Sequence, residues 1–399
     1  MLTADGWLLF ATNGVRNFAY GFISVILGLY LASQGLQAEA IGAVFTAALA
    51  GGAAITIALT AVADRIGRRR VLMAGAALMA VAGVVFSSTS NLVLLIISAI
   101  LGTISPSGKE VGPFLSVEQA ILTQAVSSEQ RTNAFALYNI IGSLAGAFGA
   151  LAVGLPGLFR LSPLLGYRAL LMAYAAAAVL LLVLFARLSP EAEALASTSG
   201  ARRSLGLHRS RGAVTKLASL FAIDAFAGGF IVQGLVSYWF YLRFGVDAAT
   251  LGAIFFGTNL LSAFSFMAAA PIAKRIGLLN TMVFTHLPSN VLLLLVPLMP
   301  GLWPAVAMLL ARHLLSQLDV PTRQSYTMAV VEPDERSAAA GITSVARNGA
   351  AAIAPAFAGA TLAVPALGLP FIIAGTVKII YDLTVLTAFR KVKPPEETN

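Results

Sequence analysis

The sequence of 399 residues contains no cysteine. Disulfide bonds, thiolate metal sites and cysteine nucleophiles are therefore excluded. Histidine is also scarce, and His208, His286 and His313 show no metal-ligand spacing. A nucleophile elbow, a phosphate-binding glycine-rich loop and a paired Asp-rich prenyl-diphosphate motif are missing as well. We therefore predict no metal, no cofactor and no enzymatic activity.

Charged residues are few: they make up 11% of the chain, against about 25% in soluble domains. Hydrophobic residues make up 58%, and the mean hydropathy is +0.86, so the chain is expected to lie mostly in a lipid bilayer. Basic residues outnumber acidic ones, 26 against 17, but they cluster in short loops at the ends of apolar runs. Membrane topology accounts for this clustering, so nucleic acid is not expected as a partner.

The apolar runs are long enough to cross a membrane many times. A spanning helix needs roughly 20 apolar residues, so the chain has room for about twelve spans. The first run is too long for a signal peptide and is expected to be the first span. We predict helices at residues 7–33, 40–62, 71–88, 91–126, 131–156, 167–188, 215–243, 247–272, 278–299, 302–330, 336–360 and 363–389.

One short stretch, residues 63–70, carries four arginines between two apolar runs. Four guanidinium groups cannot lie in hydrocarbon, so this stretch is expected to form a tight loop at the membrane surface. Short arginine-rich loops stay on the cytoplasmic side. The loop therefore predicts that both termini are cytoplasmic, in a multi-pass protein of the inner (cytoplasmic) membrane.

The two halves of the chain repeat. A shift of 210 residues aligns Ala63–Gly67 with Ala273–Gly277, and the only long polar break, 189–214, lies between the halves. Two six-helix halves joined by a polar linker are typical of a large transporter fold. We predict an N-terminal bundle at 1–188, a cytoplasmic linker at 189–214, and a C-terminal bundle with a short tail at 215–399.

The arginine loop resembles the signature that the major facilitator superfamily carries between helices 2 and 3. Thr60 stands where that family usually has a glycine, and Lys274 stands where the second copy would have an aspartate. The resemblance implies an all-α membrane protein with twelve transmembrane helices in two pseudo-symmetric six-helix bundles. It also implies that the loop is a conformational latch, formed by Asp64, Arg65, Gly67, Arg68 and Arg69.

The resemblance further implies secondary transport by alternating access. The element Pro321-Thr322-Arg323-Gln324 resembles that of bacterial exporters of drugs or metabolites, so the expected function is proton-coupled export of a small molecule by an antiporter. The expected partners are the small-molecule substrate, protons and the lipid bilayer, with the protein acting as a monomer. A non-transporting receptor or scaffold with the same fold is the remote alternative.

Ionisable side chains within the predicted spans point to a substrate cavity. Each costs about 2.5–3.5 kcal/mol at a helix centre, and such groups usually face a cavity or a partner. The Gly/Pro-rich residues 102–113 are expected as irregular backbone within the fourth span, or alternatively as an exit loop after a shorter helix. The residues predicted to line the cavity are Asn13, Arg16, Asn17, Tyr20, Lys109, Glu110, Gln233, Arg312, Asp319, Arg323, Gln324 and Arg347.

The candidate proton carriers are Glu118, Asp224 and Glu110. Glu118 and Arg323 occupy matching positions in the two halves, so they could oppose each other and close in one state of the transport cycle. Alternatively, Asp319 and Arg323 neutralise each other four residues apart on one helix. Lys378 and Asp382 have the same spacing and are interpreted as a pair of this kind.

The buried charges leave a second transport function open. Six basic side chains stand against four deep acidic ones in the predicted spans. This excess of positive charge would suit a proton-coupled carrier of a small organic anion. A pump for cationic drugs would more often show an unpaired acid and an aromatic cavity.

Overall fold

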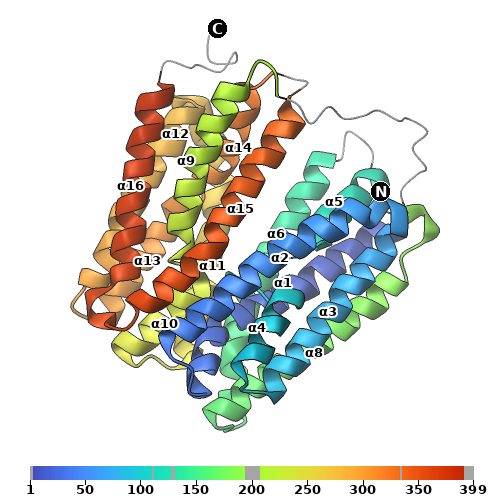
Figure 1. Cartoon of the computed structure of the whole chain (residues 1–399), viewed down its shortest axis with the longest axis vertical. Coiled ribbons are helices and arrows are strands. Elements are labelled where there is room, and N and C mark those ends of the chain that lie inside the picture. The colour runs from blue at the N-terminus through green and yellow to red at the C-terminus, as the bar shows by residue number, and fades with distance from the viewer. Residues whose placement is uncertain (1–2, 110–111, 127–130, 194–206, 333–334, 391–399) are drawn as a thin grey trace. The chain divides into compact units, whose positions relative to one another are not determined.

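The structure is a computed structural model that describes residues 3–109, 112–126, 131–193, 207–332 and 335–390 (Figure 1). Within these ranges, the side chains of Asp64, Ala125, residues 131–133 and Ser337 are not described. The regular elements of the described part are helices, as predicted. Nine of them, in that part, are long and apolar enough to cross a membrane.

The helices follow the predicted apolar runs closely, with their ends shifted by a few residues. Short 3-10 turns extend several of them. The α-helices are α1 Ala4–Ser33, α2 Ala38–Ile66, α3 Arg68–Ser88, α4 Leu92–Leu101, α5 Phe114–Ala125, α6 Arg131–Leu151, α7 Leu155–Leu158, α8 Pro163–Ala186, α9 Arg211–Gly229, α10 Gln233–Phe244, α11 Ala248–Ile276, α12 Leu278–Leu295, α13 Leu302–Ser316, α14 Asp319–Ala329, α15 Arg336–Thr361 and α16 Leu369–Phe389.

Three predicted spans are interrupted. The fourth is split into α4 and α5, and the described residues between them, 102–109 and 112–113, have irregular backbone, as the Gly/Pro-rich sequence indicated. The tenth is split into α13 and α14 at residues 317–318. The seventh is split into α9 and α10 at residues 230–232, which the sequence analysis did not predict. Each break frees backbone groups from the helical ladder, so these groups need other partners.

The chain forms two compact units. Unit 1 contains Met1–Gly200 together with Val232–Phe256, and unit 2 contains Ala201–Ile231 together with Gly257–Asn399. The second part of the broken seventh span, α10, therefore packs with the N-terminal helices. Within unit 1, Ser237 on α10 donates to the carbonyl oxygen of Val25 on α1 at 2.7 Å. The division at residues 188 and 215 stays a prediction.

Helix α1 is the central helix of unit 1, and small residues allow it to pack closely. A Cβ atom at Gly21 would lie 2.2 Å from the carbonyl oxygen of Gly146 on α6. A Cβ atom at Gly149 would lie 2.0 Å from the carbonyl oxygen of Phe18. Such close approach through glycine is the usual way in which helices associate in membranes.

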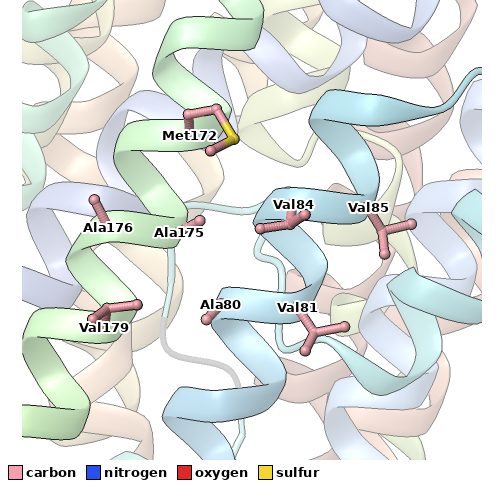
Figure 2. Close-up of a pocket in the computed structure, with 8 residues that line it drawn as sticks. All are labelled: Ala80, Val81, Val84, Val85, Met172, Ala175, Ala176 and Val179. Atoms are coloured by element: carbon pink, nitrogen blue, oxygen red, sulfur yellow. The ribbon is translucent and has the colours of Figure 1, made fainter.

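A groove of about 450 Å³ lies between α3 and α8 in unit 1 (Figure 2). Its lining is hydrocarbon except for the sulfur of one methionine, because it consists of Ala80, Val81, Val84, Val85, Met172, Ala175, Ala176 and Val179. A substrate site needs a few polar groups to orient its ligand. The groove therefore gives no basis for substrate recognition.

Candidate functional site

The most deeply buried charges in the described part of unit 1 are Arg16 on α1 and Glu118 on α5, which form an ion pair. Arg16 Nη1 lies 2.8 Å from Glu118 Oε1, and Nη2 lies 2.8 Å from Oε2. Thr12 donates to Oε1 at 2.9 Å, and the hydroxyl of Tyr138 on α6 donates to Oε2. The guanidinium group also lies 4.7 Å from the centre of the Phe114 ring. Bidentate pairs of this kind are strong and geometrically specific.

Both members of this pair are 0% exposed. Arg16 compensates the charge of Glu118. Arg16 lies one helical turn after Thr12 on α1, so both side chains reach the same carboxylate. Removing either partner would leave an uncompensated charge in the interior. Glu118 is thus part of a closed structural network within unit 1, and its role as a proton carrier stays a prediction.

The rest of the predicted polar stripe on α1 is also held by neighbouring side chains and backbone. Asn13 donates to the carbonyl oxygen of Tyr138 at 2.7 Å, and Asn17 donates to Asn13 Oδ1 at 2.7 Å. Tyr20 is fully buried, with its ring 6.3 Å from that of Tyr174 on α8. The stripe predicted to line a cavity therefore packs, at these positions, against α6 and α8.

A second polar region of unit 1 lies where the irregular backbone of residues 102–109 meets α1 and α10. Gln233 donates to Ser24 Oγ at 2.9 Å, and the backbone N–H of Gly234 donates to the carbonyl oxygen of Pro106 at 2.9 Å. The hydroxyl of Ser105 donates to the carbonyl oxygen of Lys109, and the side chain of Lys109 is exposed. Glu110 lies outside the described residues.

Unit 2 contains a larger charge network, centred on Asp224 of α9. Asp224 Oδ1 lies 2.5 Å from Lys378 Nζ on α16. Its other oxygen, Oδ2, lies 3.2 Å from Arg347 Nη1 on α15 and 3.4 Å from Arg323 Nη1 on α14. One carboxylate thus joins three cations from three helices. The side chain of Asp224 is only 4% exposed, so these contacts replace its water shell.

Arg323 has a second carboxylate partner, because its Nη1 lies 2.6 Å from Asp319 Oδ2 one helical turn earlier. The predicted i,i+4 pair on this helix therefore exists, but it is one part of the network. Arg323 also lies 5.5 Å from the centre of the Phe221 ring. Gln324, the next residue, is exposed.

His286 on α12 continues the network to a third carboxylate. Its Nδ1 lies 2.7 Å from Asp382 Oδ1 on α16, and its Nε2 lies 3.9 Å from Asp224 Oδ1. Asn290 donates to Asp382 Oδ2 at 2.9 Å. The interpretation of Lys378 and Asp382 as a pair is therefore wrong, because Lys378 contacts Asp224 and Asp382 contacts His286 and Asn290.

Arg312 on α13 differs from the other cations of unit 2. Its side chain is buried, and its Nε atom has no hydrogen-bond partner in the described part of the chain. Among the described residues, the printed hydrogen-bond partner of its Nη1 is His313 Nε2, at 3.5 Å. Asp224 and Asp319 are close enough to act on its charge, but no carboxylate among the described residues lies within ion-pair distance of it.

Charge in this region of unit 2 does not balance among the described residues. Four cationic side chains accompany three carboxylates, so one positive charge is in excess before His286 is counted. Arg347 is the most accessible member, with its side chain 28% exposed. The cations are Arg312, Arg323, Arg347 and Lys378, and the carboxylates are Asp224, Asp319 and Asp382.

The arginine loop is held by a glutamate that the sequence analysis did not single out. Glu193 accepts from the backbone N–H groups of Arg68 at 2.6 Å and Arg69 at 3.3 Å, at the N-terminus of α3. A negative charge is stabilised there by the helix dipole. Gly67 has a φ of 110°, and a Cβ atom there would lie 3.1 Å from Glu193 Oε1. Arg65 is exposed.

The side-chain contacts of this loop lie within unit 1. Arg68 Nη1 donates to Gln124 Oε1 on α5 at 3.0 Å, and Arg69 Nη1 donates to the carbonyl oxygen of Leu188 at 3.5 Å. The side chain of Asp64 lies outside the described residues. The latch role of the loop therefore stays a prediction, and the contact with α5 shows how the loop could act on the helix that carries Glu118.

The family model described as Major Facilitator Superfamily matches residues 9–316. The chain belongs to the Major Facilitator Superfamily. A curated relative, the uncharacterized membrane protein YJR124C of Saccharomyces cerevisiae, is 28% identical over 418 residues, which cover 96% of this chain and 93% of that protein.

Solved structures of Major Facilitator Superfamily transporters share the fold. The nucleoside transporter NupG matches with a TM-score of 0.74 and 16% identity, over 97% of this chain and 100% of that one. The human organic anion transporter MFSD10 (TETRAN) matches with a TM-score of 0.62 and 17% identity, over 96% and 100%. A D-xylose–proton symporter matches with a TM-score of 0.71 and 17% identity, over 95% and 96%.

Membership of this family makes the protein a multi-pass membrane transporter for small molecules. The solved structures share its all-α fold. The named substrates of the three structures differ in chemistry, so the shared fold does not choose among them. The choice has to come from this chain's own side chains.

Several residues of the two networks were missed by sequence reasoning. Thr12 and Tyr138 complete the shell of Glu118, and His286 and Asn290 complete that of Asp382. The i,i+4 spacing of His286 and Asn290 on one apolar helix was a usable signal. No spacing signal connects Tyr138 to Glu118, because their helices meet only in the folded unit.

Proposed function

We propose that this Major Facilitator Superfamily protein transports a small organic anion by alternating access, and that the cationic network of unit 2 binds it. The observation that carries the proposal is Arg312: a buried guanidinium group with an unpartnered Nε and no carboxylate within ion-pair distance in the described part of the chain. A carboxylate or phosphate group of a substrate would supply both the charge and the acceptor that Arg312 lacks.

The pairing of the carboxylates supports an anion over a lipophilic cation. Glu118 is held by Arg16, and Asp224 is held by three cations. Asp319 and Asp382 are bonded to Arg323 and His286. A cationic substrate would have to displace an existing cation from Glu118, Asp224 or Asp319, whereas an anion would find positive charge in excess.

Arg347 gives the proposed site an accessible side. Its guanidinium group is bonded to Asp224 and remains partly exposed. A substrate anion that approaches Arg347 would compete with Asp224 Oδ2 for it. We therefore assign Arg312 and Arg347 as the anion-binding pair, with Arg323 and Lys378 holding Asp224 in place.

Export, antiport and proton coupling come from the sequence resemblance and stay predictions. The same holds for the inner membrane, the cytoplasmic termini and the monomeric state. Import is the alternative direction for an organic anion. Vesicles reconstituted with the protein in a known orientation would separate the two directions, because each requires the imposed gradient to have the opposite sign.

The first test is the thermal stability of the purified protein with lactate, benzoate, citrate and phosphate beside lipophilic cations. A ligand at 100 times its dissociation constant stabilises a protein by about 2.7 kcal/mol, which is readily measured. We expect stabilisation by at least one anion, lost in Arg312→Gln and kept in Arg275→Gln, an exposed arginine at the end of α11. Stabilisation by lipophilic cations alone would overturn the proposal.

A further inference from the structure

We propose that the groove between α3 and α8 binds one phospholipid with an anionic headgroup. The acyl chain lies in the groove, and the phosphate contacts Arg168 of α8. The groove has a volume of about 450 Å³, within the range of about 300–1,000 Å³ that is usual for small-ligand sites. No transport substrate takes part in this binding, so the inference is independent of the proposed function.

The groove results from the sizes of the side chains on the two helices. A Cβ atom at Gly83 of α3 would lie only 2.9 Å from the backbone nitrogen of Ala175 on α8, so the helices approach closely there. Ala80 and Ala176 carry only methyl groups, and space remains beside them. Larger side chains, such as that of Val84, border this space (Figure 2).

The lining of the groove suits a hydrocarbon chain that enters from the bilayer. Both helices are long and apolar enough to cross a membrane. The side chains of Val81, Val84 and Val179 are exposed on them, so they present apolar surface outside the protein. A polar ligand in this lining would lose its hydration without gaining hydrogen bonds, whereas an acyl chain has no polar group to desolvate.

The groove ends near polar side chains of both helices. Met172 lies at one end of it (Figure 2), and Ser87, near the C-terminus of α3, donates to the Met172 sulfur at 3.2 Å. Arg168 lies one helical turn before Met172 on α8, so the two residues share a helix face. This end of α3 is opposite the end that carries the arginine loop. The lipid therefore belongs to the leaflet opposite that loop.

Arg168 provides the charge that selects the headgroup. Its Nε atom is buried and has no hydrogen-bond partner in the described part of the chain, and no described carboxylate lies within ion-pair distance of it. A phosphate group offers acceptors that match the donors of a guanidinium group. A zwitterionic headgroup brings its own cation to the same place, whereas an anionic headgroup does not. Basic sites between membrane helices bind anionic headgroups for this reason.

The site is tested in the full-length protein, reconstituted in phosphatidylcholine vesicles with a small share of a photoactivatable lipid. The probe carries its reactive group on the acyl chain, and its headgroup is either phosphatidylglycerol or phosphatidylcholine. Labelled peptides are quantified by mass spectrometry. We expect the phosphatidylglycerol probe to label residues 80–85 and 172–179 about fivefold more than the other probe, the factor expected from one basic residue near the surface. Equal labelling by the two probes would overturn the proposal.

Two arginine variants test the headgroup contact. Arg168→Gln should remove the preference for phosphatidylglycerol. Arg160→Gln is the matched control, because Arg160 is an exposed arginine just after α7, and this variant should keep the preference. A preference that survives in Arg168→Gln would contradict the role of Arg168.

Two alanine variants test the position of the acyl chain. Ala176→Leu places a larger side chain in the groove and should reduce the labelling by both probes. Ala173→Leu changes an exposed alanine of α8 outside the groove lining and should leave the labelling unchanged. Unchanged labelling in Ala176→Leu would contradict the proposal. Labelling of the exposed leucines of α4 by phosphatidylglycerol as strong as that of the groove would show only the surrounding bilayer, and would overturn it as well.

Discussion

Lys378 on α16 and Asp224 on α9 form an ion pair of 2.5 Å, although they lie 154 residues apart in the chain. The same lysine also donates to the carbonyl oxygen of Asp224 at 3.3 Å. The pair therefore fixes the side chain and the backbone of Asp224 at once. Its position at the centre of four helices makes it the most direct test of the network.

Asp224→Asn should destabilise the protein by about 3–5 kcal/mol, because it leaves buried cations without their carboxylate. Lys378→Met in the same protein should restore part of that loss, since it removes one of the uncompensated charges. The free energies of unfolding of the two single variants and the double variant, measured in one detergent, give the coupling. Strictly additive effects would show that the two side chains do not depend on each other.

The pair of Arg16 and Glu118 makes a parallel prediction for unit 1. Glu118→Gln should cost about 3–5 kcal/mol, because Arg16 is fully buried and would lose its bidentate partner. The double variant Arg16→Met/Glu118→Met should be more stable than Glu118→Gln alone. If that double variant still transports substrate in vesicles, Glu118 is a structural residue. If the variant is folded but transport is completely lost, Glu118 has a role in proton movement.

Glu335, just before α15, predicts a pH dependence of stability. Its hydrogen bonds with Ser210, and then those from the backbone of His208 and Arg209, lower its pKa from 4.5 to about 2. A lowered folded-state pKa means that the stabilisation is fully present above pH 4.5 and is lost as the pH falls toward 2. Unfolding curves of Glu335→Gln should therefore depend less on pH in this range than those of the wild type. Equal slopes would contradict the assignment.

Gly21 tests the close packing of α1 and α6. Gly21→Ala should destabilise the protein by about 1–3 kcal/mol, because the new methyl group would overlap the carbonyl oxygen of Gly146. Gly14 lies on the same helix, and a Cβ atom there would meet only Ile141 at 3.6 Å, an ordinary contact. Gly14→Ala is the matched control and should be neutral or slightly stabilising, since alanine favours a helix. Equal losses in both variants would exclude packing as the cause.

The sequence predicted the membrane helices well because long apolar runs and charged loops are direct consequences of the bilayer. It also predicted the irregular backbone that the structure describes at residues 102–109 and 112–113, because glycine and proline interrupt an ideal helix there. The break at residues 230–232 was missed, although Gly228 and Gly229 precede it. Two glycines in a membrane helix are common and did not by themselves require a break.

Partner choice within the charge networks was the part that local spacing could not supply. Lys378 lies four residues from Asp382, and that spacing alone predicted a pair between them. Packing of α9 against α16 offered Asp224 instead, and packing of α12 against α16 offered His286 to Asp382. The excess of buried positive charge was visible in the sequence. The fold was needed to identify the cation that has no carboxylate partner among the described residues.

Within unit 1, the carbonyl oxygen of Pro106, in the irregular backbone after α4, accepts from the N–H of Gly234, just after the break that precedes α10. Gly234 lies in the first turn of α10, where an N–H has no partner within its own helix. The bilayer core contains no water that could replace a lost hydrogen-bond partner. Repairing one interruption into a continuous helix would therefore strand a donor or an acceptor in the other. For the same reason, water has to enter between them before they can separate.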